Sequence, residues 1–187
     1  GRTMAIYPEA GHENKRHLDN FRKGFARLVF QAAARTNFEK DIFILPSGHH
    51  YDNYFEPRGK LLITYGKPIS IRPYYELYRQ NQQKALRKIA EDMMDEVRKH
   101  MLDITDLEYY AEYDFIRNTY GREFSHKMGL RFDDMEDRLK SDRKLVASLQ
   151  KAHDQEEPLF YQVMESANQY KADLKQYKVR DWVVERN

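Results

Sequence analysis

Short apolar runs, separated by polar segments, mark the first third of the chain. They occupy residues 3–7, 42–45 and 61–65, and each is followed by a proline or by a Gly-Lys-Pro turn. Proline ends a strand because it has no N–H to donate to a neighbouring strand. Continuous apolar runs, unlike alternating ones, are typical of strands that are covered on both faces. The pattern therefore predicts three buried strands.

A helix is predicted between the first two strands. Residues 22–35 carry apolar side chains at helical spacing, namely Phe25, Leu28, Val29 and Ala32. Residues 8–20 and 47–58 contain glycine, proline and asparagine, so we expect loops there. The order strand, helix, strand, strand predicts part of an α/β sheet.

The spacing of apolar residues changes after Pro73. They now recur every three or four positions, through Leu86, Ile89, Met93, Val97 and Met101, and again within 139–149 and 160–177. Thr-Asp-Leu-Glu at residues 105–108 has the form of a capping box that opens a further helix. We therefore predict two parts, an α/β part at residues 1–72 and a mostly helical extension of antiparallel hairpins at residues 73–187.

Composition excludes several classes of protein. Cysteine is absent, which excludes disulfide frameworks, cysteine-ligated zinc and thiol nucleophiles, and fits a reducing compartment. The apolar runs are only a few residues long, so we expect no bilayer-spanning segment. Residues 1–72 carry 12 Lys and Arg against 7 Asp and Glu, whereas residues 73–187 carry 20 against 23. The positive surplus at the front suits a partner with phosphates, although a chance distribution explains it equally well.

The segment after the first predicted strand carries the candidate chemistry. A strand that ends in Pro8-Glu9 and continues into a small-residue loop exposes backbone N–H groups at its tip, where α/β sheets bind ligands. Such loops hold anions, and Lys15, Arg16, Arg22 and Lys23 add positive charge nearby. The carboxylate of Glu9 is then expected to receive a substrate hydroxyl or to orient a base. The alternative is an ordinary turn with a cluster of solvated charges.

Two other features favour structural interpretations. His49 and His50 are adjacent, and adjacent residues of an extended segment point to opposite sides, so one metal rarely takes both. No other ligand pattern completes a metal site, and we expect instead a loop near the substrate entrance. The tyrosines within residues 109–120 are predicted to pack between helices rather than to form a binding platform.

Four segments together resemble the glycerolipid acyltransferase family, the group of the lysophosphatidate acyltransferases. Tyr-Pro-Glu-Ala-Gly-His at residues 7–12 is similar to that family's Phe-Pro-Glu-Gly-Thr-Arg block. Phe-Arg-Lys-Gly at residues 21–24 resembles the Phe-Lys-Lys-Gly-like start of a helix, and Ile-Leu-Pro at residues 44–46 resembles a strand ending in proline. Gly-Lys-Pro-Ile at residues 66–69 is the family's own sequence. The resemblance covers about residues 3–72.

The resemblance implies transfer of an acyl group from a thioester, on acyl carrier protein or coenzyme A, to the hydroxyl of a lysophospholipid. It implies phospholipid synthesis at the cytoplasmic face of the cell membrane, with peripheral membrane contact and without a metal, a further cofactor or a nucleic acid. The implied substrate-binding residues are Glu9, Ala10, Gly11, His12, Lys15, Arg16, Lys23 and Pro46.

The family's catalytic block, a histidine followed five positions later by aspartate, is missing. None of the seven histidines has Asp at that position. The family places this block before the Pro-Glu block, and the chain opens inside a predicted core strand without an initiator Met. We therefore expect a fragment with the acceptor-binding half of the α/β domain and without the base, inactive alone.

Two departures from the family leave the acceptor open. Ala10 stands where the family has glycine, and His12 stands where it has arginine, whose two N–H groups grip phosphate. Lys15 or Arg16 is expected to supply the missing charge, for lysophosphatidate, another lysolipid or a phosphate-free amphiphile. The alternative function is a non-catalytic module that binds a membrane surface or a protein. A His-x-x-x-x-Asp block upstream in the intact reading frame would favour the enzyme.

Overall fold

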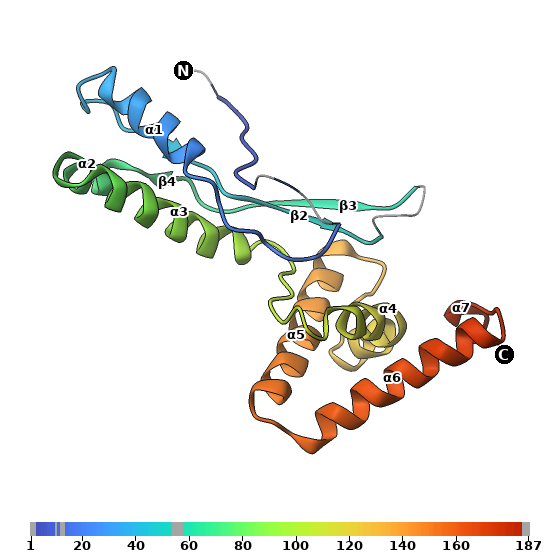
Figure 1. The fold of residues 1–187 in the computed structure, drawn as a ribbon. Helices are drawn as coiled ribbons and strands as arrows, with labels where there is room; N and C mark the ends of the chain where they lie inside the picture. The colour runs from blue at the N-terminus through green and yellow to red at the C-terminus, as the bar shows by residue number, and fades with distance from the viewer. Residues whose placement is uncertain (1–2, 10, 12–13, 54–57, 185–187) are drawn as a thin grey trace. The chain divides into compact units, whose positions relative to one another are not determined.

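The computed structural model describes residues 3–9, 11, 14–53 and 58–184 (Figure 1). The chain divides into two compact units, which we call unit 1 (Gly1–Asp103) and unit 2 (Ile104–Asn187). The predicted sequence of strands and a helix followed by helices is confirmed at this coarse level. Each unit is described by itself.

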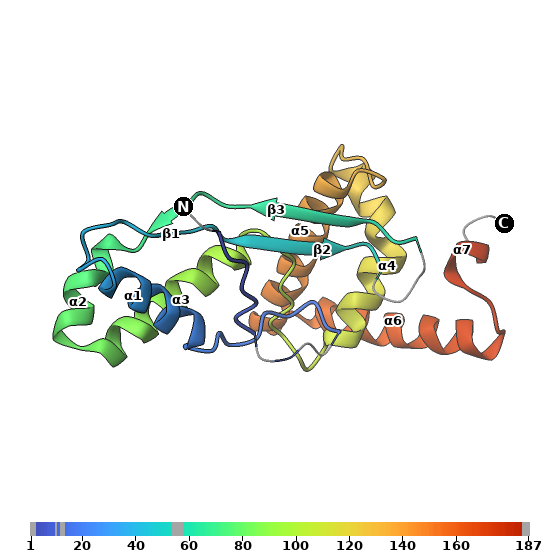
Figure 2. The ribbon, with the colours of Figure 1, turned by 90° about the horizontal axis from the view of Figure 1, so that it is seen from above.

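Unit 1 combines helices with short antiparallel strand pairs (Figures 1 and 2). Its elements in chain order are α1 (Gly24–Ala34), β1 (Phe43–Ile44), β2 (Ser47–Tyr51), β3 (Leu61–Tyr65), β4 (Ile69–Ser70), the 3-10 turn η1 (Arg72–Tyr74), α2 (Tyr75–Gln80) and α3 (Gln82–Arg98). β1 pairs with β4, and β2 pairs with β3. The backbone N–H of Gly66 donates to the carbonyl of Pro46 at 2.9 Å, between the two ladders.

The strand predictions are partly wrong. The third predicted strand, residues 61–65, is β3 as predicted, but no described strand pairs with residues 3–7, which have no regular secondary structure and are all exposed. Residues 47–51, predicted as a loop, form β2 because they pair with β3 in full register, with Ser47 opposite Tyr65. The strands are not covered on both faces, since β3 alternates between exposed and half-buried side chains.

The core of unit 1 lies among α1, α2 and α3. Its buried side chains include Phe25, Phe30, Ile71, Tyr75, Leu86 and Ile89. Phe30 stacks on Tyr78 with ring centroids 4.1 Å apart. The core of unit 1 thus continues past residue 72, where the sequence predicted a boundary, because Tyr75 and the apolar face of α3 complete the core that α1 begins. The predicted long helix itself is confirmed as α3, capped by Asn81, whose side chain accepts from the N–H of Lys84.

The chain just after α3 covers one face of β2 and β3. The hydroxyl of Thr64 donates to the carbonyl of His100 at 2.7 Å. A Cβ built on Gly48 would lie 2.0 Å from that carbonyl oxygen. Glycine is therefore required at residue 48 by a close approach of two backbone segments.

Unit 2 is helical, as predicted. Its helices are α4 (Tyr110–Lys127), α5 (Met135–Asp154), α6 (Pro158–Gln176) and the short α7 (Asp181–Val184). The capping-box prediction is wrong in detail, because Asp106 rather than Thr105 accepts from backbone N–H groups, those of Glu108 and Tyr109. The start of α5 is capped by Asp134, whose side chain accepts from the backbone N–H groups of Glu136 and Asp137.

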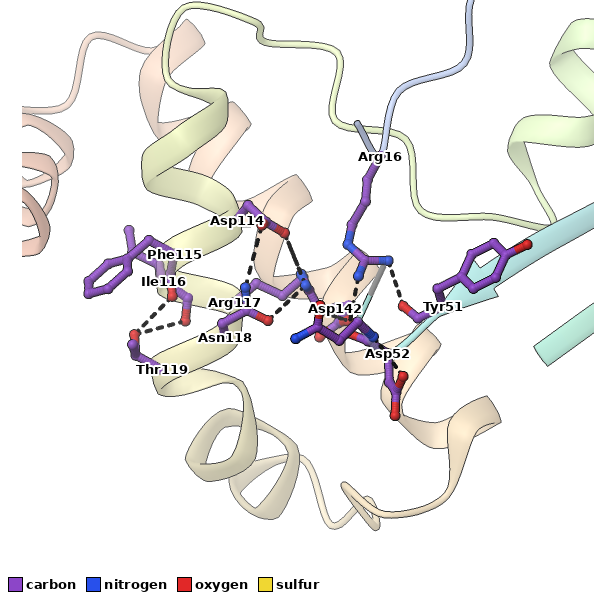
Figure 3. A network of polar contacts seen from close by, with 11 residues as sticks. Arg16, Tyr51, Asp52, Asp114, Phe115, Ile116, Arg117, Asn118, Thr119 and Asp142 are labelled. Carbon is purple, nitrogen blue, oxygen red and sulfur yellow. Dashed lines mark hydrogen bonds and ion pairs between the residues drawn. The ribbon is translucent and has the colours of Figure 1, made fainter. Parts of the chain in front are cut away.

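A buried polar network joins α4 to α5 (Figure 3). Arg117 and Asp142 are each only 1% exposed, and their side chains meet at 3.0 Å. Arg117 also donates to the side chains of Asp114 and Asn118. Burial alone would lower the pKa of Arg117, but the two carboxylates raise it above its usual value, so the guanidinium stays charged. The core of unit 2 is thus stabilised by a buried ion pair as well as by apolar packing.

Candidate functional site

The loop between the extended N-terminal segment and α1 carries the predicted site, and we call residues 9–20 the site loop. Its two ends are tied together. The backbone N–H of Arg22 donates to the carbonyl of Pro8 at 2.9 Å. The N–H of Asp19 donates to a carboxylate oxygen of Glu9 at 3.2 Å. Glu9 therefore closes the loop on itself, and its carboxylate stays at the base of the loop.

A buried carboxylate from the end of unit 1 anchors the middle of the site loop. One oxygen of Asp103 accepts from the N–H of Leu18 at 2.9 Å and lies 3.1 Å from Nδ1 of His17. The other oxygen accepts from Nε of Arg98 at 3.0 Å. The Asp103 side chain is only 7% exposed, so these contacts hold against little competition from water. His17 and Leu18 are thus held at the end of α3.

Arg16 holds the site loop to the β2–β3 hairpin. It is buried, and its guanidinium donates to the carbonyls of Tyr51 at 2.6 Å and Asp52 at 3.1 Å (Figure 3). Two neighbouring carbonyls match the fork geometry of guanidinium. Arg16 was predicted to supply charge to a phosphate. In this structure these donors serve the backbone, whereas the side chains of Lys15 and Lys23 are half-buried at the loop.

The remaining predicted residues lie in different surroundings. Gly11 is exposed, and no described atom lies within 4 Å of where its Cβ would be. Ala10 and His12 lie outside the described residues. Pro46 is buried and belongs to the strand region rather than to the site loop. Glu9, Lys15 and Arg16 therefore belong to one loop, whereas Pro46 lies between β1 and β2.

The start of α1 follows the site loop and carries no negative charge. Lys23 is the N-cap residue, none of the described side chains caps the helix, and its first turn contains no acid. Helix N-termini present backbone N–H groups and a partial positive charge. Together with Lys23, this end of α1 favours an anion beside the loop.

Sequence analysis missed the anchor made by His17, Arg98 and Asp103. Asp103 is 85 residues from Leu18, and no motif spacing connects them. A His–Asp pair therefore exists in space although no His-x-x-x-x-Asp block exists in the chain. The Asp103 carboxylate also accepts from the N–H of Leu18 and from Arg98. These bonds are typical of a carboxylate that holds a loop in place.

Neither a metal centre nor a membrane span is found among the described residues. They contain no group of three His, Asp or Glu side chains that could hold a metal. His49 and His50 lie in β2 rather than in a loop, and His50 is buried whereas His49 is half-buried, as expected for opposite faces. Of the described helices, none has a stretch long and apolar enough to cross a bilayer.

Comparison of the chain with protein-family models, with curated proteins and with solved structures found no match. Support for a function therefore comes from the residues and their geometry.

Proposed function

We propose that this chain is the acceptor-binding part of an acyltransferase of phospholipid synthesis. In the reaction, the hydroxyl of a lysophospholipid attacks the carbonyl of an acyl thioester, on acyl carrier protein or coenzyme A. The ester C–O bond forms, the C–S bond breaks, the thiol leaves, and a base takes the hydroxyl proton. The observation that carries the proposal is the Pro-Glu loop, closed by Glu9 and held in place by Asp103 and Arg16.

The proposed roles follow from the positions of the side chains. Gly11 leaves the backbone open to a phosphate, and Lys23 supplies positive charge at the start of α1. Lys15 adds positive charge from within the site loop. Glu9 fixes the loop and receives a polar group of the acceptor. Arg16 and Asp103 position the loop through their bonds to the β2–β3 hairpin and to the N–H of Leu18. Pro46 stays a proposed contact from the strand side.

The base is proposed to lie in a His-x-x-x-x-Asp block outside this chain, so this chain alone is proposed to be inactive. The substrate is a lipid, and we propose peripheral contact at the inner face of the cell membrane. The five-charge surplus of residues 1–72, 12 positive against 7 negative, supports attraction to anionic headgroups.

Mass spectrometry of lipid products tests this proposal. The 187-residue chain should give no acylated lysophosphatidate with either donor, whereas a longer protein that includes the catalytic block should. In that longer protein, Glu9→Gln should lower activity without changing the circular dichroism spectrum, and the exposed Glu39→Gln is the matched control. Turnover by the 187-residue chain would show that the base lies within it, with His17 as the first residue to replace. Full activity of Glu9→Gln would remove the main support.

One observation favours a second candidate, a non-catalytic module that binds a membrane or a protein. The side chains of Glu9 and Arg16 both bond within the protein, as in a structural turn. A longer reading frame without a His-x-x-x-x-Asp block, and without lipid products in the same assay, would favour the module.

A further inference from the structure

The β2–β3 hairpin has two unlike faces. Residues directly opposite each other in an antiparallel pair share a face. The outer face is formed by the pairs Ser47 with Tyr65, His49 with Ile63 and Tyr51 with Leu61. Leu62, Thr64, Gly48 and His50 form the inner face, which the chain around His100 covers.

The outer face keeps large apolar side chains in water. Leu61 is 44% exposed, Ile63 is 43% exposed and Tyr65 is 64% exposed. Tyr7 from the extended N-terminal segment packs edge-on against His49, with ring centroids 6.1 Å apart, and is itself exposed. Apolar residues exposed singly are ordinary, but a contiguous strand of them on one face marks a surface that contacts something apolar.

Among the described residues, the charged side chains that flank β3 in sequence have one sign. Arg58 and Lys60 precede β3, Lys67 follows it, and all three are exposed. The sequence has no Asp or Glu from residue 57 to residue 75, nor from residue 42 to residue 51. Asp52, at the end of the hairpin, accepts from the backbone N–H groups of Asn53 and Lys60, so its carboxylate is turned into the loop.

This combination discriminates between occupants. Two copies of the chain stacked on this face would bring cations against cations, with no strand carboxylate to pair with them. An anionic bilayer instead offers an apolar layer under a layer of phosphates, which matches apolar side chains flanked by Lys and Arg. Tyrosine is also enriched at the boundary between headgroups and acyl chains.

We infer that the outer face of the β2–β3 hairpin docks on an anionic lipid bilayer. Leu61, Ile63 and Tyr65 enter the headgroup boundary, and Arg58, Lys60 and Lys67 contact lipid phosphates. The inference deepens the proposed function, on which it rests for the need to reach a lipid acceptor, and it names the contacting surface.

Co-sedimentation of the 187-residue chain with vesicles tests the inference. Binding should require phosphatidylglycerol mixed into phosphatidylcholine, and salt should weaken it without abolishing it, because the apolar contacts are not screened. Ile63→Ser with Tyr65→Ser should reduce vesicle partitioning at least tenfold. Lys60→Gln with Lys67→Gln should reduce both partitioning and its salt dependence. All four side chains are exposed, so circular dichroism should show an unchanged fold.

The matched control replaces exposed aliphatic side chains of unit 2, Leu107→Ser with Leu159→Ser, and should leave partitioning unchanged. Equal loss in this control, or full binding by the Ile63 and Tyr65 variant, would overturn the inference. So would a concentration-dependent dimer in sedimentation velocity that the same variant abolishes. Acylation of detergent-dispersed acceptor by a longer, active protein is independent of bilayer docking. Acyl transfer in detergent without vesicle binding would contradict this inference and leave the proposed function intact. Vesicle binding without acyl transfer would contradict the proposed function and leave this inference intact.

Discussion

The two units use polar side chains differently. In unit 2, side chains bond to other side chains, as Arg117 does with Asp142 and Ser125 does with Ser141. In unit 1, several long-range bonds join side chains to backbone, as from Asp103 to the N–H of Leu18 and from Arg16 to the carbonyl of Tyr51. They occur beside side-chain pairs such as Tyr74 with Asp92. The difference reflects what each architecture leaves unpaired.

Helices satisfy their own backbone groups, so a polar side chain buried between helices must find another side chain. Loops and short strands leave N–H and carbonyl groups without ladder partners, and side chains from distant segments complete them. Unit 2 therefore depends on pairs of buried polar side chains. Removal of one member leaves the other buried without its partner. Unit 1 depends on anchors that fix a loop, which is the arrangement suited to holding a site in place.

The largest effect is expected from Arg117→Met, which leaves the buried carboxylate of Asp142 without its cation. Breaking such a pair costs about 3–5 kcal/mol. The free energy of unfolding in urea should fall by that amount, and amide hydrogens of α4 and α5 should exchange faster. The double variant Arg117→Met with Asp142→Leu should recover much of the loss. Wild-type stability of Arg117→Met would show that the Arg117–Asp142 pair does not stabilise unit 2.

A comparable test for unit 1 is Gly48→Ala. Its Cβ would lie 2.0 Å from the His100 carbonyl oxygen, which is backbone and can yield only by moving the chain. We expect a loss at the upper end of the about 1–3 kcal/mol typical of overpacking, measured by urea unfolding. Gly11→Ala, with no described atom within 4 Å of its Cβ, is the control. It should stay within about 0.5 kcal/mol of the parent chain.

A smaller loss is expected from Asp103→Ala. The change leaves the N–H of Leu18 and the Nε–H of Arg98 without their acceptor, at a cost of about 1–3 kcal/mol. Hydrogen exchange should accelerate across the site loop while α5 and α6 stay unchanged. Asp95→Ala removes the other, exposed carboxylate partner of Arg98 and should have little effect on the loop. Equal exchange in both variants would show that Asp103 does not anchor the loop.

The smallest effect is a dependence of unit 2 on acid. Burial raises the pKa of Asp106, but hydrogen bonds from Tyr113 and His153 outweigh it and hold the pKa below the usual 3.8. A carboxylate with a lowered folded-state pKa adds stability above its unfolded pKa and loses it as pH falls through the folded one. Unit 2 should therefore lose stability below about pH 4. Asp106→Asn should flatten this dependence in urea unfolding series, and an unchanged slope would contradict it.

Periodicity predicted the helices well because their apolar faces recur in the local sequence. The helical spacing of residues 86–101 predicted α3, which spans Gln82–Arg98, and the strand at residues 61–65 was predicted to the residue. β2 was missed because Ser-Gly-His-His has no apolar pattern, and its place in the fold depends on pairing with β3. The N-terminal run was predicted as a strand on apolarity alone, but a strand needs a partner to pair with.

The candidate site was predictable only where it is local. The Pro-Glu loop and its cations are adjacent in sequence, so Glu9, Lys15 and Arg16 were identified from it. Their orientation was not, since Arg16 bonds to carbonyls more than thirty residues away. Asp103 could not be found at all, because an anchor between distant segments leaves no spacing to detect.

The close approach at Gly48 has a consequence for how the chain folds. The hairpin forms from contacts between neighbouring segments, and such local pairing is fast. Its inner face, however, is covered by residues around His100, which follows Thr64 by 36 positions. Until the ribosome has released that segment, a newly made hairpin presents Leu62 on one face and Ile63 on the other to solvent. Synthesis that pauses in this interval leaves a strand pair apolar on both sides, the kind of intermediate that aggregates or recruits chaperones.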